Sequence, residues 1–437
     1  MIGFYNAARL AVLMAGASGL AIAFPADAQK KGKDAPAANA APALKLSNEV
    51  RAAAVKAQAA LQANDLVAAE PAIVATEAAA KTEDEQYFAS SVRLKFESLR
   101  LTASAAGDPA AFARGERVLA APLDALIANP KTPKADVARF VNLRGKIEQD
   151  AGKPKEALAF YVKSRELGFQ SADLGLSIVK ARIDSGDVPG GTAELKQLIA
   201  AEEAAGRKAP EAWYRYGIAK LNAAKLRPQT IEWLQNLAVA YPTPKNWRDV
   251  IITYGFEGST ASRLDKRQRV DLFRLLRAAG ALADQADFAE YAQATYDIGL
   301  PNESVAVIKE GRASGKIPAT SASANQLLAD SSKAAAVESL ASLEKQAAAA
   351  KTGELAAQTA DAYLGSSNYA KAIELYTMAL AKGVSKLDEV QTHIGIAQAL
   401  NGDKAAAKAS FAKVTVAPRS EIASFWSVWS NSRAPAS

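Results

Sequence analysis

Hydrophobic and polar residues along much of this chain alternate at the spacing of a helix face. In the stretch NYAKAIELYTMAL (368–380), positions 369, 372, 373, 376, 379 and 380 are apolar or aromatic, while Lys371 and Glu374 fall outside this set. Residues three and four apart share one face of an α-helix. The stretch therefore predicts an amphipathic helix whose buried face carries both small alanine and large tyrosine side chains.

The same pattern returns at intervals of about one helix pair. A shift of 35 residues carries Ala372 onto Ala407 and Tyr376 onto Phe411, and residues 143–168 repeat the layout. Two helices approach closely where small residues meet, and large side chains then fill the grooves beside the contact. The pattern predicts successive antiparallel helix pairs.

This repeat length and order of small and aromatic residues resemble the tetratricopeptide repeat, which has 34 residues. The resemblance is clear over 137–254 and 352–418 and looser over 48–82 and 285–318. It implies an all-α fold, a superhelical solenoid of antiparallel helix pairs. Proteins of this family generally hold peptides or partner subunits on the inner face of the solenoid.

We expect the solenoid to cover residues 47–418, with irregular stretches near 250–262 and 317–340. The first of these stretches combines β-branched residues with glycine, and the second lacks the repeat pattern. Residues 419–437 contain a short amphipathic segment with Phe425, Trp426 and Trp429. We predict a helix that caps the last repeat, in preference to a helix on a membrane surface, because the segment carries little positive charge.

Residues 1–28 have the pattern of a secretory signal peptide. Arg9 precedes an apolar run at 10–24, and Ala26 and Ala28 form a small-x-small cleavage pattern. No twin arginine is present, which favours the general secretory route. We therefore expect cleavage after Ala28 and a periplasmic protein, the alternative being an uncleaved anchor or a buried helix.

Residues 29–46, rich in Ala, Pro and Lys, are predicted to be a flexible linker. No later apolar run reaches the roughly 20 residues of a membrane span, so we expect no stable membrane span. The chain contains no cysteine, which excludes disulfides and thiolate chemistry. Its net charge of +7 is modest for 437 residues and does not by itself indicate nucleic acid, which we do not expect as a partner.

Candidate chemistry is sparse. The single histidine, His393, has neither a second histidine nor a cysteine to join in a metal site, and we interpret it as a helix-surface residue. Gly311 and Gly315 lack the spacing of a phosphate-binding loop. Two acids brought together by folding, as in glycosidases, remain an open alternative. The sequence favours a protein that is not an enzyme, with no catalytic residues, no cofactor and no metal.

One charged stretch stands out. Residues 262–277, SRLDKRQRVDLFRLLR, contain six basic residues and two acidic ones. The candidate partner-binding residues on this stretch are Arg263, Arg267, Arg274 and Arg277. Such a stripe would attract an acidic peptide or an anionic polymer, although an ordinary solvated helix face is the simpler interpretation.

Two functions are compatible with these features. The first is a periplasmic scaffold or adaptor that binds a protein or peptide partner on the concave surface of its helices. The alternative is a protein that binds envelope polysaccharide or peptidoglycan, an anionic envelope polymer, through the basic helix face.

Overall fold

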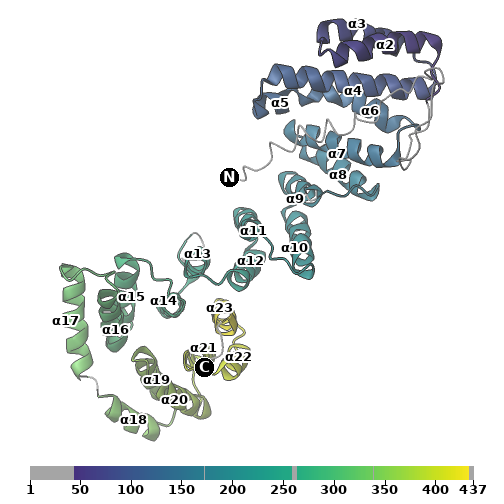
Figure 1. Cartoon of the computed structure of the whole chain (residues 1–437). Helices are drawn as coiled ribbons and strands as arrows, with labels where there is room; N and C mark the ends of the chain where they lie inside the picture. The colour runs from purple at the N-terminus through teal and green to yellow at the C-terminus, as the bar shows by residue number, and fades with distance from the viewer. Residues whose placement is uncertain (1–43, 172, 258–262, 338, 433–437) are drawn as a thin grey trace, which may run out of the picture. The chain divides into compact units, whose positions relative to one another are not determined.

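The computed structural model describes residues 44–171, 173–257, 263–337 and 339–432. Within these ranges the chain is helical and contains no strand, and the prediction of an all-α fold of antiparallel helix pairs is confirmed (Figure 1). The predicted signal peptide at 1–28, its cleavage point, and residues 29–43 of the predicted linker lie outside the described ranges. None of the described helices is long and apolar enough to cross a membrane.

The chain divides into two compact units, Met1–Lys208 and Ala209–Ser437. The helices of the first unit are α2 (Asn48–Gln62), α3 (Leu66–Ala79), α4 (Glu83–Ala105), α5 (Pro109–Gly115), α6 (Ala120–Ala128), α7 (Lys134–Asp150), α8 (Pro154–Glu166), α9 (Leu174–Asp184) and α10 (Val188–Ala204), with a short 3₁₀ turn at Glu116–Leu119.

The helices of the second unit are α11 (Glu211–Ala223), α12 (Arg227–Ala240), α13 (Pro244–Gly255), α14 (Lys266–Ala278), α15 (Gln285–Asp297), α16 (Pro301–Ala313), α17 (Ala322–Val337), α18 (Leu340–Ala349), α19 (Glu354–Gly365), α20 (Tyr369–Lys382), α21 (Leu387–Leu400), α22 (Lys404–Phe411) and α23 (Arg419–Ser432).

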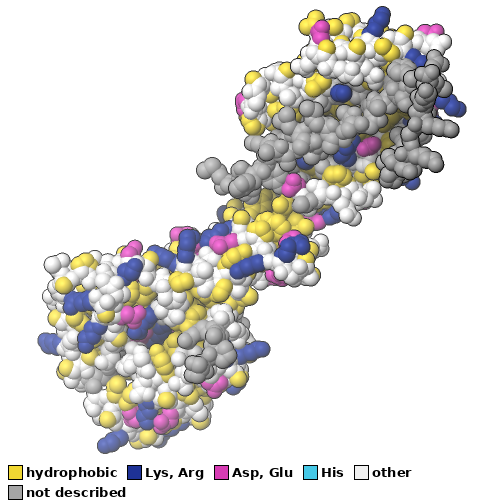
Figure 2. Space-filling view, in the orientation of Figure 1, with side chains coloured by type: hydrophobic (Ala, Val, Ile, Leu, Met, Phe, Trp, Pro, Cys, Tyr) yellow, Lys and Arg dark blue, Asp and Glu magenta, His cyan; other side chains and the backbone are white. Residues whose placement is uncertain are grey.

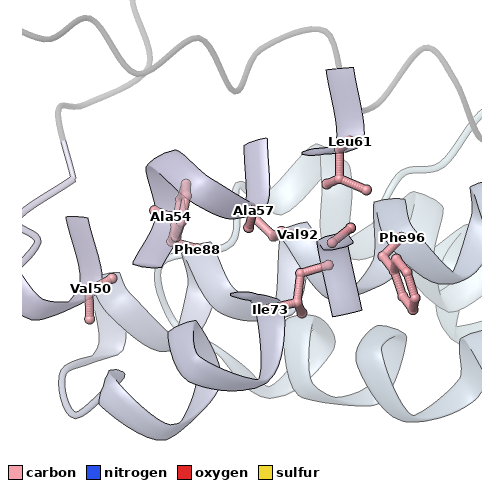
Figure 3. Close-up of a cluster of buried hydrophobic side chains, with 9 residues drawn as sticks. Val50, Ala54, Ala57, Leu61, Ile73, Phe88, Val92 and Phe96 are labelled. Atoms are coloured by element: carbon pink, nitrogen blue, oxygen red, sulfur yellow. The ribbon is translucent and has the colours of Figure 1, made fainter. Parts of the chain in front are cut away.

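A core of apolar side chains joins the first three helices of unit 1. Helix α2 contributes residues three and four apart, which places them on one face toward α3 and α4. The buried side chains labelled in Figure 3 are Val50, Ala54, Ala57 and Leu61 from α2, Ile73 from α3, and Phe88, Val92 and Phe96 from α4. The same face-to-face burial drives the pairing of helices in the rest of the unit.

Close helix crossings depend on glycine beside an aromatic ring. In unit 1, a Cβ atom at Gly145 would lie 2.6 Å from the Tyr161 ring. In unit 2, a Cβ atom at Gly217 would lie 2.5 Å from the Trp233 ring, and one at Gly395 would lie 2.5 Å from Phe411. Real Cβ atoms do not approach so closely, so the hydrogen of glycine is what lets these helices meet.

The two stretches that we expected to be irregular differ in character. Helix α13 continues to Gly255, and residues 258–262 lie outside the described ranges. The 317–340 stretch is occupied mainly by α17, of which Ala324 and Ser331 are buried. Ser331 is tied to α16 by a 2.9 Å hydrogen bond to Ser304 Oγ. Most of α17 is therefore not buried, which explains why it lacks the repeat pattern of small and aromatic buried residues.

Unit 2 curls so that its last helix returns to its first ones. Helix α23 packs against α21 and α22, as expected of a helix that follows the last repeat, and also against α12 and α14 (Figure 1). Its aromatic side chains Phe425 and Trp426 are fully buried. This return of α23 positions the candidate site.

Candidate functional site

Helix α14 presents a charged stripe to the interior of unit 2. It begins with a capping box, in which Asp265 accepts a hydrogen bond from the backbone N–H of Gln268 at 2.8 Å. Arg267, Asp271 and Arg274 follow at the spacing of one helix face. Asp271 is fully buried and Arg274 is 5% exposed, so the stripe faces inward.

Three of the four predicted partner-binding arginines are paired within the chain. Arg274 donates two hydrogen bonds to Glu303, at 2.9 and 2.7 Å, and one to Asp271 at 3.0 Å. Arg267 Nη1 lies 3.0 Å from Asp361 Oδ2. The same pairing extends to the end of the helix, where Arg277 Nε lies 2.6 Å from a carboxylate oxygen of Glu310.

The interpretation of these residues as a solvated helix face is therefore wrong for Arg274, which lies in the interior. The physical reason is that folding brings carboxylates from α16 and α19 to this face of α14, so the stripe is covered by charges of opposite sign from the same unit. Arg263 lies before the helix and is exposed. A partner-binding role for these residues stays a prediction, and Arg263 is the one that solvent reaches freely.

The histidine that we expected on a helix surface is buried. His393 is 2% exposed because α20, α22 and α23 pack around its helix, α21. Its Nδ1 lies 2.7 Å from Asp361 Oδ1 and its Nε2 lies 3.2 Å from Asp271 Oδ2. Burial by itself would lower the pKa of His393, but the two carboxylates raise this pKa to about 9. The ring is therefore an imidazolium at neutral pH that donates from both nitrogens.

Arg419, the first residue of α23, completes this group of charges. It forms an ion pair with Asp271 through Nη1, and its Nη2 lies 2.9 Å from Glu389 Oε2. We call the whole group the charged cluster. It consists of four cations and four carboxylates, namely Arg267, Arg274, His393 and Arg419 with Asp271, Glu303, Asp361 and Glu389. Helix α23 thus supplies one of the four cations.

Two buried tyrosines support the carboxylates of the charged cluster. Tyr291 donates to Glu303 at 2.6 Å, and Tyr376 donates to Asp361 at 2.6 Å. Burial would raise the pKa of Asp361, but the adjacent imidazolium lowers it to about 2. Asp361 and His393 thus both stay charged around neutral pH. A general acid or base works best when its pKa lies near the working pH, so this arrangement favours holding helices together over proton transfer.

Helix α23 is held by a surface that we call the α23 seat. The residues of this seat are Arg227 and Gln235 on α12, Tyr254 on α13, Asp271 on α14 and Glu389 on α21. These five side chains come from four helices that the fold brings around one end of unit 2.

The contacts of the α23 seat combine polar and aromatic groups. Glu421 forms an ion pair with Arg227 and accepts a 2.9 Å hydrogen bond from Tyr254. The indole N–H of Trp426 donates to the backbone oxygen of Asp271 at 3.1 Å. The Phe425 and Tyr254 rings are 4.8 Å apart between centroids. The seat can therefore recognise a helix by its charge, its hydrogen-bonding groups and its aromatic side chains.

Sequence reasoning missed the carboxylates of the charged cluster and Arg419. A signal was present, because Asp361 stands between apolar residues on the buried side of its helix, where a charged residue requires a partner. Its ion-pair partner Arg267 was not readable from the sequence, since Arg267 and Asp361 are 94 positions apart. Within the described ranges, no group of three or more His, Cys, Asp or Glu residues is arranged to hold a metal ion.

No protein-family model matches this chain, and no curated protein matches it. Among solved structures, it is similar to the pentatricopeptide repeat protein PPR10 from maize, with 11% identity, a TM-score of 0.27, and coverage of 86% of this chain and 60% of that chain. It is also similar to the Naa15/Naa10 structure bound to HypK-THB, with 11% identity, a TM-score of 0.20, and coverage of 84% and 69%. This chain thus spans about three fifths of the maize protein's chain. The description of this protein as a helical repeat protein rests on its own helix packing.

Proposed function

We propose that this protein is a non-enzymatic scaffold of the tetratricopeptide-repeat type, which binds a protein or peptide partner on the concave side of its helices in the periplasm. The single observation that carries the proposal is the binding of α23 by unit 2. Four helices of the array hold an amphipathic helix through ion pairs, hydrogen bonds and buried aromatic rings. Helix arrays commonly use such surfaces for partners.

The proposed periplasmic location is supported by the signal-peptide pattern at residues 1–28. The repeat type is supported by the 34- to 35-residue spacing of small and aromatic residues. Glycine against an aromatic ring, as at Gly217 and Trp233, gives this spacing a physical basis.

The alternative, binding of an anionic envelope polymer through the basic face of α14, is less well supported. Arg267, Arg274 and Arg277 already form ion pairs within the chain, with Asp361, Glu303 and Glu310 respectively. On the face of unit 2 shown in Figure 2, the Lys and Arg side chains are spread over the surface instead of forming one continuous patch.

Cross-linking capture from cell envelopes tests the proposal. The bait is the mature protein, and the matched variant carries Arg263→Glu with Lys266→Glu, two exposed positions outside the charged cluster. We expect one protein to be enriched by both baits and to remain bound at about 0.5 M salt, where exposed charges are screened within about 4 Å. Recovery of anionic polymer alone, lost in the variant, would instead establish the polymer-binding function.

A further inference from the structure

We propose that the α23 seat is a recognition groove for an amphipathic helix, and that the partner binds by placing such a helix where α23 now lies. The recognised helix carries a basic residue, an acidic residue and an aromatic pair at the spacing of Arg419, Glu421, Phe425 and Trp426. This inference rests on the proposed function and adds the class of partner and the place where it binds.

The polar contacts of α23 specify where charges must lie along the bound helix. Glu421 meets Arg227 and Tyr254, two residues of the array that fit a carboxylate at this position. One turn later, Ser424 accepts a hydrogen bond from Gln235. A helix with a basic residue in place of Glu421 would bring two cations together, so the groove selects against it.

The apolar contacts provide the anchor. Ile422, Phe425 and Trp426 are fully buried against the array. Phe425 packs on the Tyr254 ring, and the Trp426 indole N–H donates to the backbone oxygen of Asp271. Large aromatic side chains in closed pockets commonly dominate the affinity of helical ligands.

The charges of the charged cluster favour a cation on the bound helix. Without α23, Arg267, Arg274 and His393 remain against the four carboxylates of the cluster, and Lys386 Nζ lies 4.0 Å from Glu389 at its edge. A buried negative charge in excess is unfavourable unless a positive group compensates it. A basic residue at the position of Arg419 is therefore preferred, because it pairs with both Asp271 and Glu389.

The groove can stay assembled while its helix exchanges. Asp271 keeps Arg274 and His393 as partners when Arg419 leaves, and Glu389 keeps Arg267 nearby. Helices α19 to α22 also pack on one another in sequence. Helix α23 is joined to α22 by a short segment in which Val416 is 65% exposed. The connection before α23 is thus open to solvent.

The test uses the full chain with a specific protease site introduced in the exposed turn at Val416. After cleavage, a fluorescein-labelled peptide of residues 419–432 is added and its binding is followed by fluorescence anisotropy. We expect saturable 1:1 exchange into the cleaved protein and at least 100-fold weaker binding to the uncleaved protein, whose own α23 competes at high effective concentration. Peptides with Arg419→Ala or Trp426→Ala should bind at least tenfold more weakly.

Two results of this experiment would refute the proposal that the α23 seat is a recognition groove. The first is loss of helical circular dichroism on cleavage without uptake of the peptide, which would make α23 an inseparable part of the core. The second is equal binding of the wild-type and the two substituted peptides, which would remove the specificity that the inference claims.

Capture from cell envelopes separates the inference from the proposed function. The cleaved protein should retain more of the partner than the uncleaved protein, and the wild-type peptide, unlike the Trp426→Ala peptide, should release it. A partner that neither peptide releases would refute the inference and leave the scaffold function standing. The absence of any captured protein would refute the scaffold function and the partner assignment together, while the peptide exchange would still decide whether the groove exists.

Discussion

Replacing the only histidine should remove most of the pH dependence of unit 2 between pH 7 and 9. His393 lies between Asp271 and Asp361, with Tyr376 bonded to the latter and Arg419 to the former. The proposed change is His393→Gln, which keeps a hydrogen-bond donor of similar size but cannot carry a charge.

The size of the effect follows from the two carboxylates. They raise the pKa of His393 from 6.5 to about 9 in the folded protein. A difference of this size corresponds to about 3 kcal/mol of stability. Because the folded pKa is raised, this contribution is fully present below pH 6.5 and is lost as the pH rises through 9. Between pH 7 and pH 9, the wild-type free energy of unfolding should fall by about 2 kcal/mol.

The chain is well suited to this measurement. It has one histidine and no cysteine, so few other groups titrate in this range. All five tryptophans belong to unit 2, at positions 213, 233, 247, 426 and 429, and their fluorescence therefore reports the unfolding of that unit alone. Guanidinium unfolding at fixed ionic strength, repeated from pH 6.5 to pH 9, gives the free energy directly.

The His393→Gln variant should be less stable than the wild type at pH 7, since two buried carboxylates lose their shared cation. Its free energy of unfolding should change little from pH 7 to pH 9. A flat wild-type profile would refute the charged state that we assign to His393. Equal slopes in the wild type and the variant would show that another group is responsible.

Three further outcomes are expected. Gly395→Ala places a Cβ atom 2.5 Å from the Phe411 ring. The overpacking should lower the free energy of unfolding by about 1 to 3 kcal/mol, which exceeds the gain from the higher helix propensity of alanine. An unchanged guanidinium midpoint would contradict this. Lys382→Met removes an ammonium that donates to carbonyl oxygens at the end of α18, at 2.8 Å to Ala347, and should cost about 1 kcal/mol and speed amide exchange over 340–350. Protein isolated from an exporting host should begin at Gln29, and its intact mass checks this. A mass that still includes residues 1–28 would contradict the prediction.

Local pattern was enough to predict helices α19 to α22 and how they pair. Ala360 and Tyr376, which the repeat spacing places on buried faces, are both fully buried. The reason is that helix periodicity depends on residues three and four apart, and pairing with the next helix depends on a turn of a few residues. Both relations can be read within one repeat.

Local pattern misplaced His393 and part of the α14 stripe. A histidine among polar neighbours and arginines on a helix look exposed when the helix is considered alone. The partners that bury them lie far along the chain: Arg267 and Asp361 are 94 positions apart, and Arg419 and Asp271 are 148 apart. No periodicity within one repeat carries information over such separations.

The sequence by itself therefore determined the helical repeat, the absence of thiol chemistry and the presence of an aromatic C-terminal helix. Only the tertiary structure decided which charges are inside, and that α23 returns to α12 and α14 and pairs with their charged residues. The physical reason is that a charge becomes stable in an interior only through the opposite charges and hydrogen bonds that folding brings to it. Whether a given arginine meets solvent or a carboxylate is thus a property of the assembled unit.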